Sequence, residues 1–202
     1  MGMGKGEMGM GKGEMGRGTA HLEPNTSHLR MGCVAKEAPM SYPSPQYLGE
    51  GGEVSAVFRP AGAEPDLKIG PVTEARYLAT GELTKGKFGL YRWDMPGNAP
   101  GAALHFHRTL AESFFILSGV VEISDGETWR QAGAGDYLYV PEGGLHAFRY
   151  QSGDPASMLI LFAPGAPREG YFEGLADIAL GRRQLTPEEY KAFCDSHDNY
   201  FV

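Results

Sequence analysis

The stretch ALHFHRTLAESFFILSG, residues 103–119, places two histidines and a glutamate inside an apolar run with strand character. Successive side chains of a β-strand point to opposite faces, so His105 and His107 project from the same side. Glu112 begins the next strand-like segment and can join them if the chain folds back as a hairpin. Left unpaired in a β interior, each group would cost roughly 1–3 kcal/mol, whereas a divalent cation would satisfy all three. The spacing therefore predicts a metal site on β-strands.

A second stretch, GDYLYVPEGGLHAFRY at residues 135–150, supplies a fourth candidate ligand. Pro141 ends a predicted strand, and Glu142 and the two glycines after it form a turn. His146 starts the returning strand and can meet the first three residues. The alternative, a hydrogen-bonded cluster without metal, stays open.

The remaining histidines and the two cysteines lie outside these stretches. His21, His28 and His197 fall in a predicted tail or terminus, where we expect solvated side chains. Cys33 and Cys194 are far apart and lack CxxC spacing, which argues against a disulfide scaffold or a thiolate metal site.

The 30 glycines and 14 prolines favour a turn-rich, all-β build, because these residues interrupt helices and populate turns. Asp125-Gly126 predicts a type I′ hairpin, and a further turn is expected near Lys85 and Gly86. Many short strands with regular turns imply a sandwich, jelly roll or barrel. The predicted strands cover residues 53–60, a pair within 75–96, 103–108, 112–117, 120–124, 128–131, 137–140, 146–151 and 157–162.

Three parts are expected along the chain. Residues 1–40 form a low-complexity tail that opens with the repeat GMGKGE, and we expect it to be disordered, with Met15, Met31 or Met40 as alternative starts. Residues 41–167 form the barrel, preceded by an extended arm around Tyr42–Gly52. Residues 168–202 form a helical extension, in which Thr186-Pro187-Glu188-Glu189 is a typical helix start. We expect its two short helices to pack on the barrel exterior.

The composition excludes several classes of partner. The net charge is −7, so the chain has no basic surface for a nucleic acid backbone. No segment approaches the roughly 18 apolar residues of a membrane span. These features and the cysteine usage predict a cytoplasmic protein.

The two stretches resemble the paired motifs of cupins. The pattern HxHx4Ex6G is matched by His105, His107, Glu112 and Gly119, and Gx5PxGx2H by Gly135, Pro141, Gly143 and His146. The resemblance covers about residues 50–165. Ala99 stands where the first motif usually opens with glycine, and Tyr150 where the second usually ends in asparagine.

This resemblance implies a single cupin jelly-roll barrel, the double-stranded β-helix, with one divalent transition metal ion held by the three histidines and Glu112. Fe2+, Mn2+ and Ni2+ suit such a site, as do Cu2+, Co2+ and Zn2+. Aromatic residues that share faces with the ligands, or stand on a neighbouring strand, are candidates for a substrate pocket or for ordinary core packing. They are Phe114, Phe148, Tyr150, Tyr91 and Trp93.

The implied function is that of a metal-dependent dioxygenase similar to quercetin 2,3-dioxygenases, acting with dioxygen on an aromatic or enol-type small molecule. Glu112 would be both ligand and base. Two alternatives stay open. One is an oxygen-independent isomerase, cyclase or decarboxylase of natural-product biosynthesis, and the other is a non-enzymatic small-molecule-binding cupin. The open sheet edges of a small barrel also predict a homodimer.

Overall fold

The computed structural model describes residues 41–69, 73–97, 99, 101–150 and 153–202. The chain divides into two units, Met1–Val54 and Ser55–Val202. The described part of the first unit, residues 41–54, is exposed and contains no helix or strand. The predicted arm lies in this segment, whereas the predicted tail lies outside the described residues.

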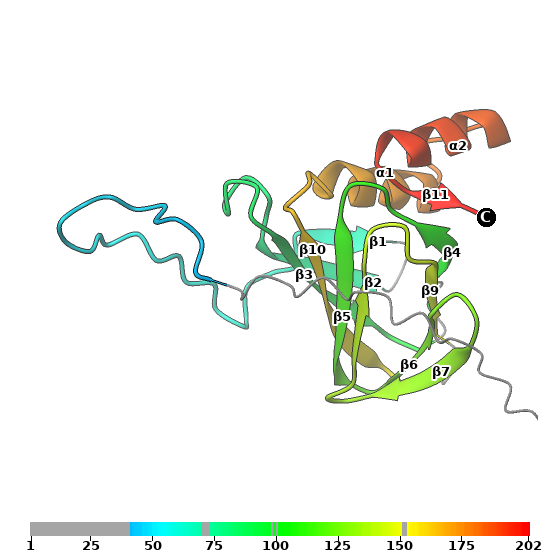
Figure 1. The fold of residues 1–202 in the computed structure, drawn as a ribbon. Coiled ribbons are helices and arrows are strands. Elements are labelled where there is room, and N and C mark those ends of the chain that lie inside the picture. The colour runs from blue at the N-terminus through cyan, green and yellow to red at the C-terminus, as the bar shows by residue number, and fades with distance from the viewer. Residues whose placement is uncertain (1–40, 70–72, 98, 100, 151–152) are drawn as a thin grey trace, which may run out of the picture. The chain divides into compact units, whose positions relative to one another are not determined.

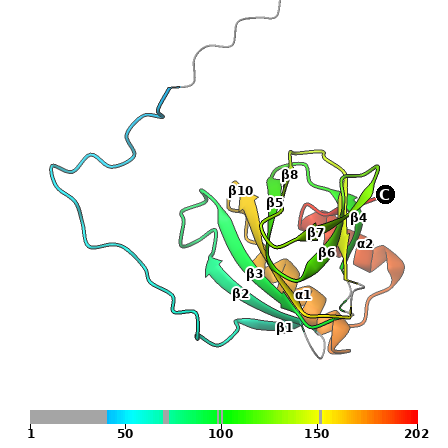
Figure 2. The same cartoon turned by 90° about the horizontal axis from the view of Figure 1, so that it is seen from below.

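The second unit consists of two antiparallel sheets that enclose a common interior (Figures 1 and 2). The first sheet has the strand order β1 (Leu67–Ile69), β2 (Thr73–Ala79), β3 (Gly89–Met95), β10 (Ala156–Ala163), β5 (Ala111–Ser118), β8 (Tyr137–Val140). The second has the order β11 (Tyr200–Phe201), β4 (Ala102–Phe106), β9 (His146–Arg149), β6 (Val120–Ser124), β7 (Trp129–Gly133). This arrangement confirms the predicted all-β jelly-roll barrel.

The core follows from the alternation of side chains along the strands. In β3, every second residue from Gly89 to Met95 is buried, which places Tyr91 and Trp93 inside. β10 pairs with both β3 and β5 and contributes Met158, Ile160 and Phe162, all at most 2% exposed. The interior is therefore aromatic and aliphatic along the first sheet.

One predicted strand is absent. Residues 53–60 form no strand, and the side chains of Val54, Val57 and Phe58 are 109%, 69% and 87% exposed. Apolar, β-branched composition favours a strand only where a partner strand can complete the hydrogen-bond ladder, and this segment pairs with none in the described chain. The prediction for 53–60 is therefore wrong, and the chain enters the sheet later, at β1.

The turn predictions had mixed outcomes. Lys85 and Gly86 have φ of 56° and 77°, as expected for a tight turn between β2 and β3. The β6–β7 hairpin also forms, but only Gly126 of the Asp125-Gly126 pair has a positive φ, so the turn is not type I′. The Asp125 carboxylate instead accepts the N–H groups of Glu127 and Thr128 at 3.1 and 2.9 Å. This side-chain capping stabilises a longer loop.

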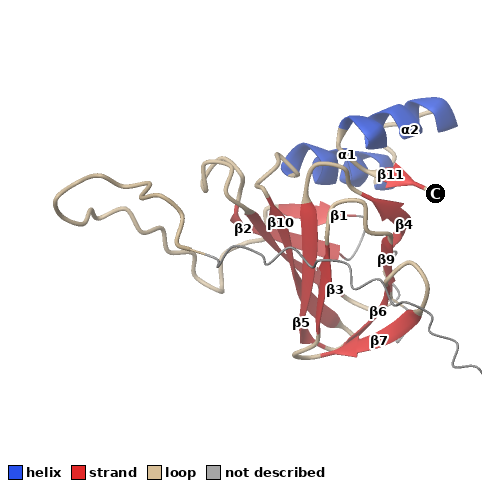
Figure 3. Cartoon of the chain, viewed as in Figure 1, coloured by secondary structure: helices blue, strands red, loops and turns tan. Residues whose placement is uncertain are grey.

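Both C-terminal helices are present, as α1 (Glu169–Ala179) and α2 (Pro187–Ser196). The predicted capping box is formed, with Thr186 accepting from the Glu189 N–H and the Glu189 carboxylate accepting from the Thr186 N–H. The helices do not simply cover the exterior. The Phe172 ring of α1 lies 5.2 Å from the rings of Tyr91 and Trp93, so α1 packs into the same core as the strands. Figure 3 shows α1 next to β1. No helix in the described part of the chain is long and apolar enough to cross a membrane.

Candidate metal centre

The two sheets bring His105, His107, Glu112 and His146 together. His105 on β4 is paired in register with His146 on β9, His107 follows β4, and Glu112 comes from β5 of the opposite sheet. Their donor atoms all lie within 4.8 Å of one another. All four side chains are buried, with Glu112 the most exposed at 5%. The structure therefore gathers the four predicted ligands at one point inside the barrel.

Two of the imidazoles are each oriented by the backbone carbonyl two residues earlier in the chain. His105 Nδ1 lies 2.8 Å from the carbonyl oxygen of Ala103, and His146 Nδ1 lies 3.0 Å from that of Gly144. A carbonyl oxygen can only accept, so each Nδ1 carries the hydrogen. The Nε2 atoms are then free of hydrogen in the neutral rings, which is the tautomer that binds a metal through Nε2.

His107 is oriented by a residue far along the chain. Its Nδ1 donates to the carbonyl oxygen of Asp198, which follows α2. The Asp198 carboxylate accepts the N–H groups of Arg108 and Thr109, both at 2.9 Å, and the Thr109 hydroxyl at 2.7 Å. Asp198 has a φ of 56°, in the left-handed region that aspartate tolerates better than most residues. The C-terminal segment is thus fixed to the loop that holds His107.

The turn of the second motif is also tied to His107. Gly143 has a φ of 81°, which favours glycine, and its N–H donates to the His107 carbonyl oxygen at 2.7 Å. The two motifs therefore meet through the backbone as well as through their side chains. The positive φ explains why glycine is favoured three residues before His146.

Contacts with Glu112 indicate what the cluster lacks. Its Oε2 lies 2.9 Å from His107 Nε2 and 2.8 Å from His146 Nε2. With the Nδ1 hydrogens already committed, neutral imidazoles would present lone pairs to a carboxylate, which is repulsive. A cation shared by these atoms removes the conflict, and spacings near 3 Å suit neighbouring ligands bonded at roughly 2.0–2.2 Å. The donor set therefore fits a divalent metal.

The pKa values of the cluster are set by burial and by the contacts between its members. Burial lowers the pKa of His105 to about 4, so its ring is neutral at pH 7. Burial alone would raise the pKa of Glu112, but the close imidazoles of His107 and His146 outweigh burial and hold that pKa well below its usual range. Burial alone would lower the pKa of His146, but the Glu112 carboxylate outweighs burial and raises it, because only a protonated ring or a metal ion can satisfy the carboxylate at this distance. Glu112 is therefore an anion, as a metal ligand must be.

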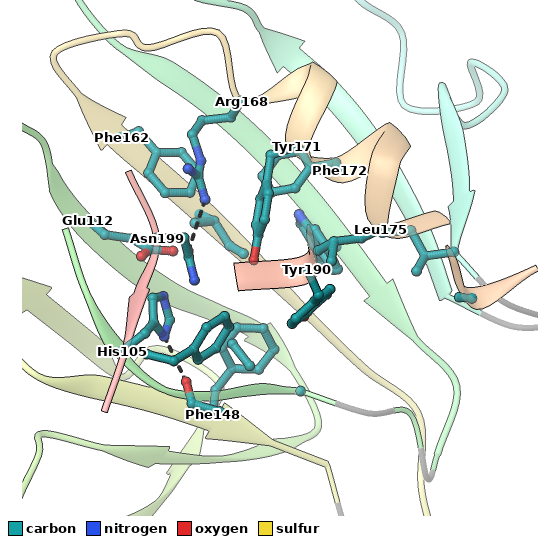
Figure 4. A pocket seen from close by; sticks show the side chains of 18 residues that line it. His105, Glu112, Phe148, Phe162, Arg168, Tyr171, Phe172, Leu175, Tyr190 and Asn199 are labelled. Carbon is teal, nitrogen blue, oxygen red and sulfur yellow. Dashed lines mark hydrogen bonds between the residues drawn. The ribbon is translucent and has the colours of Figure 1, made fainter. Parts of the chain in front are cut away.

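A cavity of about 300 Å³ opens beside the cluster. His105 and Glu112 line one side of it, and the barrel residues Trp93, Phe148 and Phe162 line its wall. Helix α1 closes it with Tyr171, Phe172 and Leu175 (Figure 4). The volume is at the lower end of the roughly 300–1,000 Å³ typical of small-molecule sites.

The five aromatic residues predicted to bind substrate fall into two groups. Trp93 and Phe148 line the cavity, whereas Phe114, Tyr91 and Tyr150 are not among its lining residues. The Phe114 ring packs 5.8 Å from that of Phe148, the Tyr91 hydroxyl donates to Glu169 at 2.6 Å, and Tyr150 is 4% exposed. Substrate contact by any of the five stays a prediction.

Sequence reasoning missed the cavity residues that come from the C-terminal segment. Arg168, Tyr190 and Asn199 all line the cavity, and Arg168 immediately precedes α1. Neither periodicity nor spacing marks them, because nothing in a linear pattern tells which end of the barrel a following helix will cover. The one feature that could have indicated a binding role for this segment is Arg168, a basic residue directly before an apolar helix face.

Only two of the histidines and cysteines outside the two motifs lie among the described residues. His21, His28 and Cys33 lie outside the described residues. His197 contacts the Phe193 carbonyl oxygen through Nδ1 at 2.7 Å, away from the cluster. Cys194 is a buried free cysteine, and burial raises the pKa of its thiol.

Residues 91–162 match the model of the cupin domain, a segment that includes all four clustered residues. No curated protein matches the chain. A predicted oxalate decarboxylase from Thermotoga maritima is 21% identical, with 54% of this chain and 99% of that chain covered and a TM-score of 0.49. The polyketide cyclase RemF from Streptomyces resistomycificus is 19% identical, with coverages of 48% and 70% and a TM-score of 0.42. The DMSP lyase DddQ from Ruegeria pomeroyi is 30% identical over 39% of each chain, with a TM-score of 0.34.

Proposed function

We propose that the chain is a metal-dependent enzyme that acts on an aromatic or enol-type small molecule in the cavity beside the cluster. The observation that supports this most is the close approach of Glu112 Oε2 to the Nε2 atoms of His107 and His146. The approach is repulsive between a carboxylate and neutral imidazoles, and a divalent cation bound between them would remove the repulsion. A cluster without metal would need protonated imidazoles in a buried site, which is costly. The proposed ligands are His105, His107, Glu112 and His146.

The metal is proposed to be Fe2+, Mn2+ or Ni2+, with Cu2+, Co2+ and Zn2+ as alternatives, because imidazole and carboxylate donors suit all of them. When bound, such an ion supplies Lewis acidity that lowers the pKa of a substrate hydroxyl. Elemental analysis of protein purified without an affinity tag identifies the ion. Less than about one tenth of a metal per chain, after reconstitution with each of the six ions, would contradict the proposal.

The chain's own residues would hold the substrate and exclude water. Trp93 and Phe148 offer flat apolar walls for an aromatic or conjugated body, and Phe172 closes the opposite side. Glu112, which reaches the cavity, is the proposed proton acceptor for a substrate hydroxyl. Its low pKa makes its role as a ligand the stronger of the two.

We propose that the reaction is a dioxygenation of the quercetinase-like type. The test measures consumption of a flavonol and of a polyketide-like enol by the metal-loaded protein, with an oxygen electrode, in air and under anaerobic conditions. Consumption of substrate together with oxygen, and none without oxygen, is expected. Equal consumption without oxygen would instead identify an isomerase, cyclase or decarboxylase, and saturable binding without any consumption would identify a binding protein. Glu112→Gln serves as the inactive control.

We also propose a cytoplasmic homodimer. The outer face of β5 and β8 exposes Phe115, Leu117, Tyr137 and Tyr139, at 40%, 37%, 62% and 56%. Contiguous apolar surface of this kind is typical of interfaces between chains. Light scattering at micromolar concentration should give twice the chain mass, and Tyr137→Lys with Tyr139→Lys should shift it to the chain mass. A monomeric unmodified protein would contradict the dimer.

A further inference from the structure

Arg168 is a buried cation that forms no ion pair within the described part of the chain. Its side chain is 3% exposed, and its guanidinium carbon lies 4.8 and 4.6 Å from the ring centres of Phe162 and Tyr171. Its Nη1 donates to the His197 carbonyl oxygen at 2.5 Å. Among the described residues, no carboxylate forms an ion pair with it. A buried charge is costly unless an opposite charge meets it, so this position calls for an anion.

Three nitrogen donors at the cavity have no acceptor. They are Nε of Arg168, Nδ2 of Asn199 and Nε1 of Trp93, all buried and without a hydrogen-bond partner in the described chain. The three residues line the same cavity as Glu112 and His105. Asn199 Oδ1 faces Arg168 Nη2 at 3.5 Å, so its amide hydrogens point elsewhere (Figure 4). Donors without matching acceptors indicate a ligand that brings acceptors.

The charges around the cavity also favour an anionic ligand. Of the residues that the structure describes, only one acidic residue, Glu112, lines the cavity, and its Oε2 already lies close to two imidazoles. A divalent ion at the cluster would add two positive charges to that of Arg168. A neutral ligand or water could accept the hydrogen bonds but would leave the cation with only the longer-range attraction of Glu112 and Asp198. An organic anion would accept the hydrogen bonds and also compensate the cation.

We propose that the substrate is a small carboxylate, whose carboxylate group is bound by Arg168 and Asn199 while its apolar body packs against Trp93 and Phe148. This inference rests on the proposed function, since it names the substrate class of the same cavity. The guanidinium fork matches the two carboxylate oxygens, and the flanking Phe162 and Tyr171 rings fix its orientation. The substrate's other end then lies toward His105 and Glu112.

The test uses the full-length protein, metal-free and metal-loaded, with three acid and amide pairs as probes: acetate and acetamide, benzoate and benzamide, phenylacetate and phenylacetamide. Isothermal titration calorimetry compares each acid with its amide, which has nearly the same shape but no charge. We expect at least one acid to bind about tenfold or more tightly than its amide, in the metal-free protein as well. Arg168→Met should abolish this preference. Arg183→Met is the matched control, because Arg183 also stacks on an aromatic ring, 4.8 Å from the centre of Phe193, but lines a different cavity.

Equal binding of acid and amide in all three pairs, or an acid preference retained by Arg168→Met, would overturn the inference. If Arg168→Met does not fold, Asn199→Asp replaces it. A fixed carboxylate beside Arg168 should compete with the acid and lower the protein's affinity for the acid about tenfold or more. Metal content separates the two proposals. A protein that binds metal but shows no acid preference disproves the carboxylate alone. One that prefers acids but binds no metal disproves the metal-dependent function alone.

Discussion

The cavity has two polar sides that differ in origin and in completeness. On one side, four residues on or next to the barrel strands lie close together, and each of the three imidazoles is held by a backbone carbonyl. On the other, Arg168 and Asn199 come from the C-terminal segment and have donors without partners among the described residues. The first side could hold an ion of fixed geometry. The second side is where we propose that the substrate carboxylate binds, so the two sides should respond differently to substitution.

The largest expected effect is the loss of metal from the barrel side. His107→Ala removes one donor and the tie to Asp198, so metal content after purification should fall to background. Elemental analysis measures it. His197→Gln, which changes a histidine outside the cluster, should keep the metal of the unmodified protein. Full metal content in His107→Ala would contradict the contrast between the two sides of the cavity, because the four clustered residues would then not act as one metal site.

A smaller effect is expected where the two sides are joined. Asp198→Ala removes the carboxylate that accepts from Arg108 and Thr109 and should loosen the carbonyl that holds His107. Loss of such outer contacts typically weakens metal affinity by about 10–100-fold. Competition with a chelator measures the affinity.

The control for this prediction is Asp195→Ala, which removes an exposed aspartate paired with Lys191 in the same segment. It should leave the affinity for metal unchanged. If Asp198→Ala behaved like the control, the C-terminal segment would have no part in forming the metal centre, and the two sides would be independent.

The smallest effect should come from weakening the C-terminal side alone. Thr186→Ala removes the N-cap of α2 and should lower the free energy of unfolding by about 1 kcal/mol. Thermal or urea unfolding measures this loss, with Thr186→Ser, which keeps the hydroxyl, as the control. Metal content should stay the same. A clear loss of metal would show that α2 supports the cluster more than its contacts indicate.

The barrel and its cluster could be predicted from local pattern. Alternation places His105 and His107 on one face, and turn residues such as Gly143 fix where the second motif folds back. Nine of the expected strands form at or near their predicted positions because hydrophobic alternation and turn chemistry agree there. The strand prediction for residues 53–60 is wrong because a strand-like composition does not by itself provide a partner strand.

The donor side of the cavity could not be predicted in this way. Arg168 and Asn199 contribute through where α1 and β11 lie in space, and this depends on packing between segments far apart in the chain. The hydrogen bond between His107 and Asp198 joins residues 91 positions apart. No periodicity marks such a contact, so these residues were expected to cover the barrel rather than to complete its site.

That bond also has a consequence for synthesis. A ribosome that has made the chain as far as His146 has produced all four donors of the cluster, but not the carbonyl that orients His107. A metal captured at that moment would be held by a ring still free to rotate, and it could exchange with other ions. Secure retention of the proposed ion would begin only when residue 198 has emerged and folded back, which would make loading a late event in maturation.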